Sequence, residues 1–111
     1  MEKIKLSNIK FNKDGLVPVI VQDSDSLKIL MLAYSNEEAV RLSIKKKLAH
    51  FWSRSRNELW LKGNTSGNYL KIVSILIDCD SDSLVYKVDL DGKKACHTGE
   101  ESCFFKEINN E

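Results

Sequence analysis

The segment ILIDCDSDSLVY, residues 75–86, places three acids at alternate positions, Asp78, Asp80 and Asp82, with a cysteine between the first two. Carboxylates are hard oxygen ligands that suit Mg2+ or Ca2+, whereas a thiolate is a soft ligand that suits zinc. Neighbouring carboxylates repel one another unless water or a cation neutralises them. The segment therefore predicts either a site for a hard cation or an acidic turn in solvent.

In an extended strand, the alternation of side chains would separate the two kinds of ligand. Asp78 and Asp80 would share one face, and Asp82 would join them if the extended conformation continues. The opposite face would carry Val73, Ile75, Ile77 and Cys79. The cysteine and the acids therefore need not serve the same metal.

A calcium loop of the EF-hand type fits the same acids less well. The acids fall at its first, third and fifth positions, and Asp89 falls at the twelfth. Ser83 stands at the sixth position, where glycine is expected, and the flanking residues predict strands rather than helices. The sequence therefore disfavours an EF-hand.

The chain has three cysteines, Cys79, Cys96 and Cys103. An odd number in a chain expected to be cytoplasmic argues against a disulfide framework. Three thiolates would leave the fourth position of a tetrahedral zinc open to water, as in catalytic sites. His97 could instead fill that position in a structural site, or it could transfer protons beside the zinc. Burial of Cys79 as a small apolar side chain is the alternative.

The segment HFWSRSRNELWLKGNTSGN, residues 50–68, combines aromatic, basic and small polar residues. Guanidinium groups and the backbone amides of a Gly/Ser/Thr loop can bind phosphate, and indoles can stack on a base. An exposed hairpin with its aromatic residues toward the core is the alternative. The candidates for substrate binding are Trp52, Arg54, Arg56, Lys62, Thr65, Ser66 and Gly67.

A helix is predicted at residues 35–50, where the hydrophobic period changes. Ser35 and Glu38 form a capping box, and Val40, Ile44 and Leu48 give one apolar stripe. Three lysines near the end of this segment suit the helix dipole and solvent better than a binding patch.

Strands are predicted on both sides of this helix, because apolar and β-branched runs alternate with polar turns. The predicted strands cover residues 16–23, 27–34, 50–53, 59–62, 69–80 and 83–90. The first two look like a hairpin, and residues 91–94 read as a turn. Residues 95–108 predict a loop with a short helix. The fold class is therefore α+β, with a mixed or antiparallel sheet and one main helix.

The size and charge of the chain narrow the class of protein. A length of 111 residues predicts a single domain, residues 1–111. A net charge of +1 argues against a general nucleic-acid binder. No window predicts a signal peptide or a membrane span, so we expect a cytoplasmic protein with no membrane partner.

Four motifs occur in order: LMLAYSNEEA, HFWSRSRNELWLKGNTSGN, DCDSD and ACHTGEESCFF. Together they resemble the phosphoribosyl-AMP cyclohydrolase family over roughly residues 15–105. The chain looks like the stand-alone form, without a fused pyrophosphohydrolase domain. The resemblance implies a zinc-dependent obligate homodimer that also requires Mg2+. It implies hydrolysis of the N1–C6 bond in the adenine ring of 1-(5-phosphoribosyl)-AMP by zinc-activated water, the third step of histidine biosynthesis.

The family's functional residues fall on matching positions of this sequence. Its zinc ligands correspond to Cys79 of one subunit and to Cys96 and Cys103 of the other, which places the metal sites at the dimer interface. Its Mg2+ ligands correspond to Asp78, Asp80 and Asp82, and its catalytic histidine corresponds to His97. Ser81 stands where glycine is common, and Asn68 where histidine is common.

The competing interpretation is a zinc-stapled dimer without catalytic activity that binds nucleotide or RNA through the Trp/Arg hairpin. The three-thiolate set argues against it, because that set leaves one zinc coordination position open. Measuring absorbance with phosphoribosyl-AMP would separate the two interpretations, since opening the ring changes the chromophore.

Overall fold

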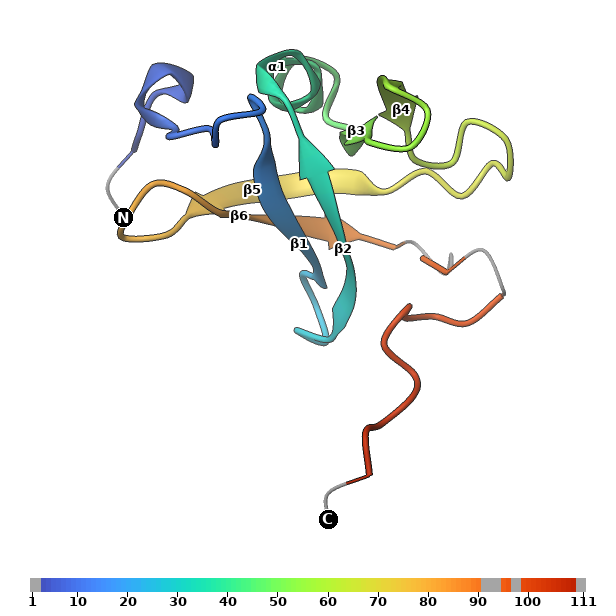
Figure 1. Cartoon of the computed structure of the whole chain (residues 1–111). Helices are drawn as coiled ribbons and strands as arrows, with labels where there is room; N and C mark the ends of the chain where they lie inside the picture. Colours follow the sequence, from blue (N-terminus) through green and yellow to red (C-terminus); the bar gives the residue numbers. More distant parts are fainter. Residues whose placement is uncertain (1–2, 91–94, 97–98, 110–111) are drawn as a thin grey trace.

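The computed structural model describes residues 3–90, 95–96 and 99–109. It consists of short strands with one α-helix between the second and the third (Figure 1). The elements are the 3-10 turn η1 (Leu6–Asn8), β1 (Val17–Asp23), β2 (Ile29–Ser35), α1 (Glu37–Lys46), β3 (His50–Ser53), β4 (Glu58–Leu61), β5 (Lys71–Ile77) and β6 (Leu84–Asp89).

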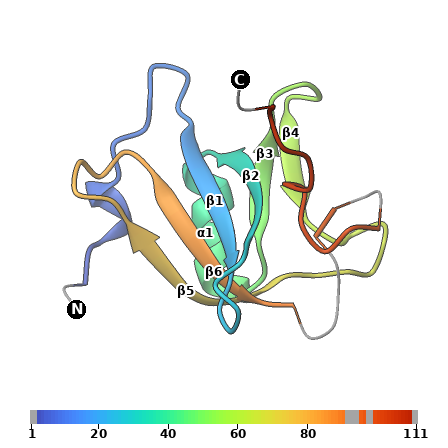
Figure 2. The ribbon, with the colours of Figure 1, turned by 90° about the horizontal axis from the view of Figure 1, so that it is seen from below.

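Six strands form two sheets. The larger sheet has the order β2-β1-β6-β5, which can be followed in Figure 2, and the smaller one is the β3–β4 hairpin. Strand β1 pairs antiparallel with β2 and parallel with β6, and β5 pairs antiparallel with β6. The prediction of an α+β fold with a mixed sheet and one main helix is confirmed.

The core lies between the four-stranded sheet and a layer formed by α1 and the β3–β4 hairpin (Figure 1). Strand β1 alternates, so that Val17, Val19 and Val21 are fully buried. The ring of Phe51 on β3 stacks at 5.7 Å from that of Tyr86 on β6, which joins the two layers. Burial of such side chains contributes about 1.5–3 kcal/mol each and holds the hairpin on the sheet.

Helix α1 begins one residue later than predicted. Asn36 is the N-cap, and its side-chain oxygen accepts a hydrogen bond from the Ala39 N–H at 2.9 Å. Ser35 ends β2 instead, and its hydroxyl donates to the His50 carbonyl at 3.3 Å. The predicted capping box at Ser35 and Glu38 is therefore wrong, because a contact with β3 uses the Ser35 hydroxyl.

The buried face of α1 also differs from the predicted stripe. Ala39, Val40 and Ser43 are buried, whereas Ile44 is 46% exposed. Leu48 lies beyond the helix, which ends at Lys46. Small residues on the buried face allow the helix to approach β3 closely, so only Val40 of the predicted stripe is confirmed. The lysines at the helix end are exposed, as predicted.

Two further predictions need correction. Strand β5 ends at Ile77, not at residue 80, and the pairing register shifts between Ile72 and Ser74, which leaves Val73 61% exposed. The described residues of the C-terminal tail, 95–96 and 99–109, contain no helix. The predicted turn at 91–94 lies outside the described residues.

None of the helices in the described part of the chain is long and apolar enough to cross a membrane.

The hydroxyl of Tyr86 is buried in the core. Among the described residues it makes no hydrogen bond of ordinary geometry. The hydroxyls of Ser35 and Ser43 lie near it, but they donate to backbone carbonyls. Burial raises the pKa of Tyr86 above its usual value.

We predict that Tyr86→Phe keeps the free energy of unfolding within about 1 kcal/mol of the wild-type value. The substitution removes only a hydroxyl that contributes little hydrogen-bond stabilisation to the folded protein. Tyr86→Ala should cost about 3–5 kcal/mol through the lost ring. Above about pH 10, Tyr86 ionises in the unfolded chain but stays protonated in the folded protein. The wild type should therefore lose stability relative to Tyr86→Phe. Urea denaturation across pH measures both effects. A Tyr86→Phe loss above about 2 kcal/mol would indicate a hydrogen-bonded hydroxyl.

Candidate functional site: an acid turn, a thiol pair and a pocket

The three acids meet in a tight turn between β5 and β6, residues 78–83, which we call the acid turn. The Asp78 N–H donates to the Ser83 carbonyl at 3.1 Å, and the Asp82 N–H donates to Asp78 Oδ1 at 3.0 Å. The predicted continuation of the strand is therefore wrong, because the chain reverses here. Carboxylate oxygens of Asp78, Asp80 and Asp82 lie within 4.8 Å of one another in solvent.

The acids of this turn influence one another's charge. A hydrogen bond with Asp78 raises the pKa of Asp82, and burial and the charges of Asp78 and Asp80 raise it further. A hydrogen bond from the Ser83 side chain lowers the pKa of Asp78. The donor set contains only oxygen and carries repelling charges, so its chemistry fits a hard divalent cation.

Two cysteines come together at the opposite end of the sheet. Cys96 is buried and Cys103 is more exposed, and the two thiols lie close enough for Cys96 to affect the pKa of Cys103. Burial raises the pKa of Cys103, and the Cys96 contact raises it further. The Cys103 N–H donates to the Leu30 carbonyl at 2.7 Å, which fixes the tail along β2. We call Cys96 and Cys103 the thiol pair.

Cys79 lies far from this pair within one chain. It sits exposed in the acid turn before β6, whereas the thiol pair follows β6 (Figure 1). Six extended residues of β6 span roughly 17 Å. Ligands of one zinc lie about 2.3 Å from the metal, so their sulfur atoms must be within about 4–5 Å of one another. Among the described residues, only the acids of the turn form a group of three that could share one metal.

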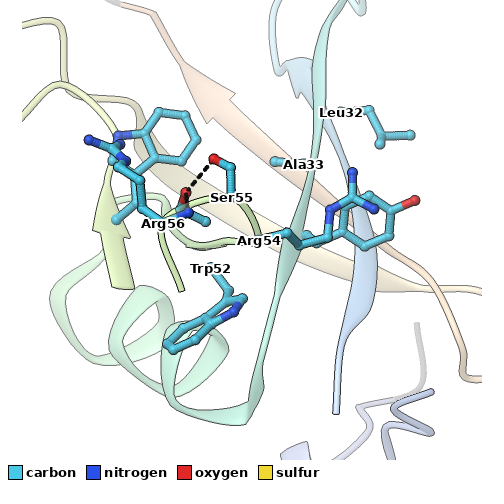
Figure 3. A pocket seen from close by; sticks show the side chains of 9 residues that line it. Leu32, Ala33, Trp52, Arg54, Ser55 and Arg56 are labelled. Atoms are coloured by element: carbon cyan, nitrogen blue, oxygen red, sulfur yellow. Dashed lines mark hydrogen bonds between the residues drawn. The ribbon is translucent and has the colours of Figure 1, made fainter. Parts of the chain in front are cut away.

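A pocket of about 680 Å³ opens between β2 and the β3–β4 hairpin (Figure 3). The guanidinium of Arg54 lies over the Tyr34 ring at 3.9 Å. The Arg56 guanidinium lies 3.7 Å from the Glu58 carboxylate, and the Arg56 backbone N–H donates to the Ser53 hydroxyl at 3.3 Å. The lining residues are Leu32, Ala33, Tyr34, Trp52, Ser53, Arg54, Ser55, Arg56 and Trp60.

The pocket and the thiol pair are neighbours. On β2, the Leu30 carbonyl accepts a hydrogen bond from the Cys103 N–H. Leu32, two residues later on the same strand, lines the pocket. On the hairpin side, the Lys62 ammonium lies 5.8 Å from the ring centroid of Trp60, which also lines the pocket. The same ammonium is close enough to Cys103 to oppose the rise of its pKa. The arrangement places a cationic aromatic pocket beside two thiols, which are candidate ligands for a soft metal.

The structure brings together only part of the predicted substrate-binding set. Trp52, Arg54 and Arg56 line the pocket. Lys62 is buried beside the thiol pair rather than in the pocket lining. The loop residues are exposed and do not line the pocket, namely Thr65, Ser66 and Gly67. The predicted catalytic residue, His97, lies outside the described residues.

Sequence reasoning missed the β2 wall of the pocket, Leu32, Ala33 and Tyr34. The only local signal was Tyr34, an aromatic residue at the end of an apolar run just before the helix. Its position opposite the hairpin depends on contacts between β2 and β3, which join residues far apart in the chain.

The loop after β4 depends on one glycine. Gly63 has φ +95, and a Cβ there would lie 2.5 Å from backbone atoms of Asn68 and Tyr69. Its carbonyl accepts from the Gly67 N–H at 2.7 Å, which closes the loop. Only glycine satisfies both the left-handed backbone and this close approach.

These features define a small α+β domain with two groups of candidate metal ligands and a cationic aromatic pocket. The family model described as phosphoribosyl-AMP cyclohydrolase matches residues 31–105. The chain belongs to the phosphoribosyl-AMP cyclohydrolase family, and it is an enzyme of that family.

Individual relatives agree with this assignment. The chain is 50% identical to the phosphoribosyl-AMP cyclohydrolase of Archaeoglobus fulgidus over 103 residues, which cover 93% of this chain and 94% of the relative. It is also 50% identical to that of Cellvibrio japonicus over 105 residues, 95% of this chain and 83% of the relative. The histidine biosynthesis bifunctional protein of Aquifex aeolicus is 47% identical over 100 residues, 90% of this chain but 49% of that protein.

We predict that Gly63→Ala lowers the free energy of unfolding by about 2–4 kcal/mol, because it combines a strained φ with a backbone clash. Gly15→Ala is the matched control. Its φ of +75 is also left-handed, but a Cβ there meets nothing within 4 Å. It should cost only about 1 kcal/mol. Equal losses in chemical denaturation would contradict the role of the close approach.

Proposed function

We propose that this enzyme hydrolyses the N1–C6 bond in the adenine ring of 1-(5-phosphoribosyl)-AMP, as a step of histidine biosynthesis, with zinc and Mg2+ as cofactors. The observation that carries the proposal is the position of the thiol pair beside the cationic aromatic pocket. Membership of the family and the names of the relatives support the substrate. We also propose a cytoplasmic homodimer.

The pocket has the chemistry that the substrate requires. Its indoles, Trp52 and Trp60, offer faces on which a purine can stack. Arg54 and Arg56 offer planar forks of N–H donors that match phosphate oxygens. The exposed loop with Thr65, Ser66 and Gly67 would bind the second phosphate, because the substrate carries two phosphates at its two ends. Lys62 would add positive charge between the pocket and the thiol pair.

Zinc would be held by the thiol pair of one subunit and by Cys79 of a second. Soft thiolates fit this metal, and the position of buried Cys96 beside Cys103 supports the binding of one metal by both thiols. When bound, zinc supplies Lewis-acid activation of water near neutral pH. The pocket would orient C6 of the ring toward the thiol pair. His97 follows Cys96 in the chain and would donate a proton to N1 as the bond breaks.

The acid turn would bring Mg2+ to the same place. Cys79 lies between Asp78 and Asp80, so a second subunit that supplied Cys79 would also supply the three carboxylates. Mg2+ bound there would neutralise the repelling acids and could meet a substrate phosphate. Both metals would then lie where two subunits meet.

Exposed apolar side chains support a second subunit. Ile20 on β1 and Leu32 on β2 point out of the sheet, and Phe104 and Phe105 stand exposed just after the thiol pair. Ile20 and Leu32 are partners across the two strands, and an exposed apolar patch favours an interface. In a two-fold dimer the same patch serves both subunits, so one contact would build two equal metal sites.

We predict that removing metals with a chelator abolishes ring opening, and that zinc together with Mg2+ restores it, because the water needs activation. Absorbance during incubation with phosphoribosyl-AMP follows the ring opening. Metal analysis should find about one zinc per chain. Cys79→Ala, Cys96→Ala and Cys103→Ala should each abolish turnover.

Two outcomes would contradict this proposal. Metal-free protein that opens the ring at the full rate would exclude the metal requirement. A flat absorbance trace with zinc, Mg2+ and a bound nucleotide would instead favour a binding module without catalysis.

We predict that co-expressed Cys79→Ala and Cys96→Ala chains regain activity although each variant alone is inactive. In a mixed dimer, one zinc site receives all three cysteines, and the other receives only one. A 1:1 mixture should recover about a quarter of the wild-type activity, since half of the dimers are mixed and each has one intact site of two. Zinc content of the isolated mixed dimer provides a second readout.

The matched control places both substitutions in one chain and co-expresses it with the wild type. With sites shared between subunits, mixed dimers of this pair have no intact site, so about a quarter of the activity remains. With sites inside one chain, about half would remain, and the first mixture would stay inactive. The two mixtures together distinguish the arrangements.

A further inference from the structure

We infer that Tyr34 is a positioning residue of the substrate pocket, whose ring holds the guanidinium of Arg54 ready to bind a phosphate group of the nucleotide. This inference rests on the proposed function, since it assigns one substrate group to one side of the pocket. Neither the motifs nor the family membership assign a role to Tyr34.

The contact bridges two elements that close the pocket. Tyr34 lies on β2, opposite Pro18 of β1 in the sheet, so its backbone is held by strand pairing. Arg54 belongs to the turn between β3 and β4, and its side chain extends toward β2 in Figure 3. Its Cζ atom lies 3.9 Å from the centroid of the Tyr34 ring. A flexible side chain on an exposed turn is thus placed by an aromatic ring on a strand.

Stacking leaves the binding edges of the guanidinium available. A guanidinium that lies over an aromatic ring can meet it through its flat face, and its five N–H donors then point outward in its plane. The arrangement restricts the long Arg54 side chain before a ligand arrives, which lowers the entropy lost on binding. A planar fork held in this way matches two oxygens of a phosphate.

The two arginines of the pocket are not equivalent. Arg56 lies 3.7 Å from the Glu58 carboxylate, so part of its charge is already neutralised. Of the ion pairs found among residues 3–90, 95–96 and 99–109, none involves Arg54. Arg54 therefore keeps a whole positive charge for an anionic ligand, and we assign the phosphate to it rather than to Arg56.

Binding of AMP to zinc-free protein tests the inference without any catalytic step. Quenching of Trp52 and Trp60 fluorescence reports occupancy of the pocket, and adenosine serves as the probe without phosphate. Tyr34→Leu should raise the Kd for AMP about 3- to 30-fold, as expected for loss of a cation–aromatic contact. The Kd for adenosine should change less than about 2-fold, because the base does not need Arg54.

Two further variants separate positioning from simple structural damage. Tyr34→Phe keeps the aromatic face and should retain AMP binding close to wild type. Arg54→Lys keeps the charge but loses the planar fork, and it should weaken AMP binding as Tyr34→Leu does. With metals and phosphoribosyl-AMP, Tyr34→Leu should raise KM by a similar factor and leave kcat nearly unchanged.

Three outcomes would overturn the inference. They are wild-type AMP affinity in Tyr34→Leu, equal loss of AMP and adenosine, or no AMP binding by the wild type at millimolar concentrations. The proposed reaction can fail independently, since a protein that shows this AMP pattern but never opens the ring would keep the phosphate assignment and lose the cyclohydrolase mechanism.

Discussion

Strand β6 sets a fixed distance between the acid turn and the thiol pair. It is paired on both sides, parallel to β1 and antiparallel to β5, so it can neither shorten nor bend without breaking two ladders. Cys79 lies before it and the thiol pair lies after it. An extended strand therefore separates Cys79 from the thiol pair, so the proposed zinc site would need Cys79 from a second subunit.

Strand β2 connects the thiol pair to the pocket. Its backbone holds Cys103 at Leu30, and its next residues form one wall of the pocket. The opposite wall is the β3–β4 hairpin, which the stacked rings of Phe51 and Tyr86 attach to the sheet. The thiol pair and the pocket thus share one support, and the proposed hydrolytic site would need its groups to be held in this way.

Much of the fold could be predicted because strands and turns leave local signals. Alternation located the strands, and polar residues located the hairpin turns. Local signals could not decide between Ser35 and Asn36 as the N-cap, because both residue types cap helices well and only the contact with His50 separates them. The exposure of Val73 depends on a register shift against β6, which no local pattern reports.

The candidate site divides in the same way. The candidate metal ligands and the candidate binding hairpin could be chosen from residue chemistry, and Trp52, Arg54 and Arg56 do meet in one pocket. The shape of the acid turn depends on hydrogen bonds across it, and the contact of Tyr34 with Arg54 depends on β2 facing the hairpin. Those relations arise from packing between distant segments.

The parallel pairing of β1 with β6 also has a consequence during synthesis. Val19 on β1 faces Leu84 on β6, so the centre of the sheet joins the first fifth of the chain to its last third. Until β6 leaves the ribosome, the β1–β2 hairpin has an open edge where that strand belongs. Such long-range pairing forms late and slowly, and an unpaired edge can recruit other chains. The nascent chain is therefore most exposed to aggregation just before the sheet is completed.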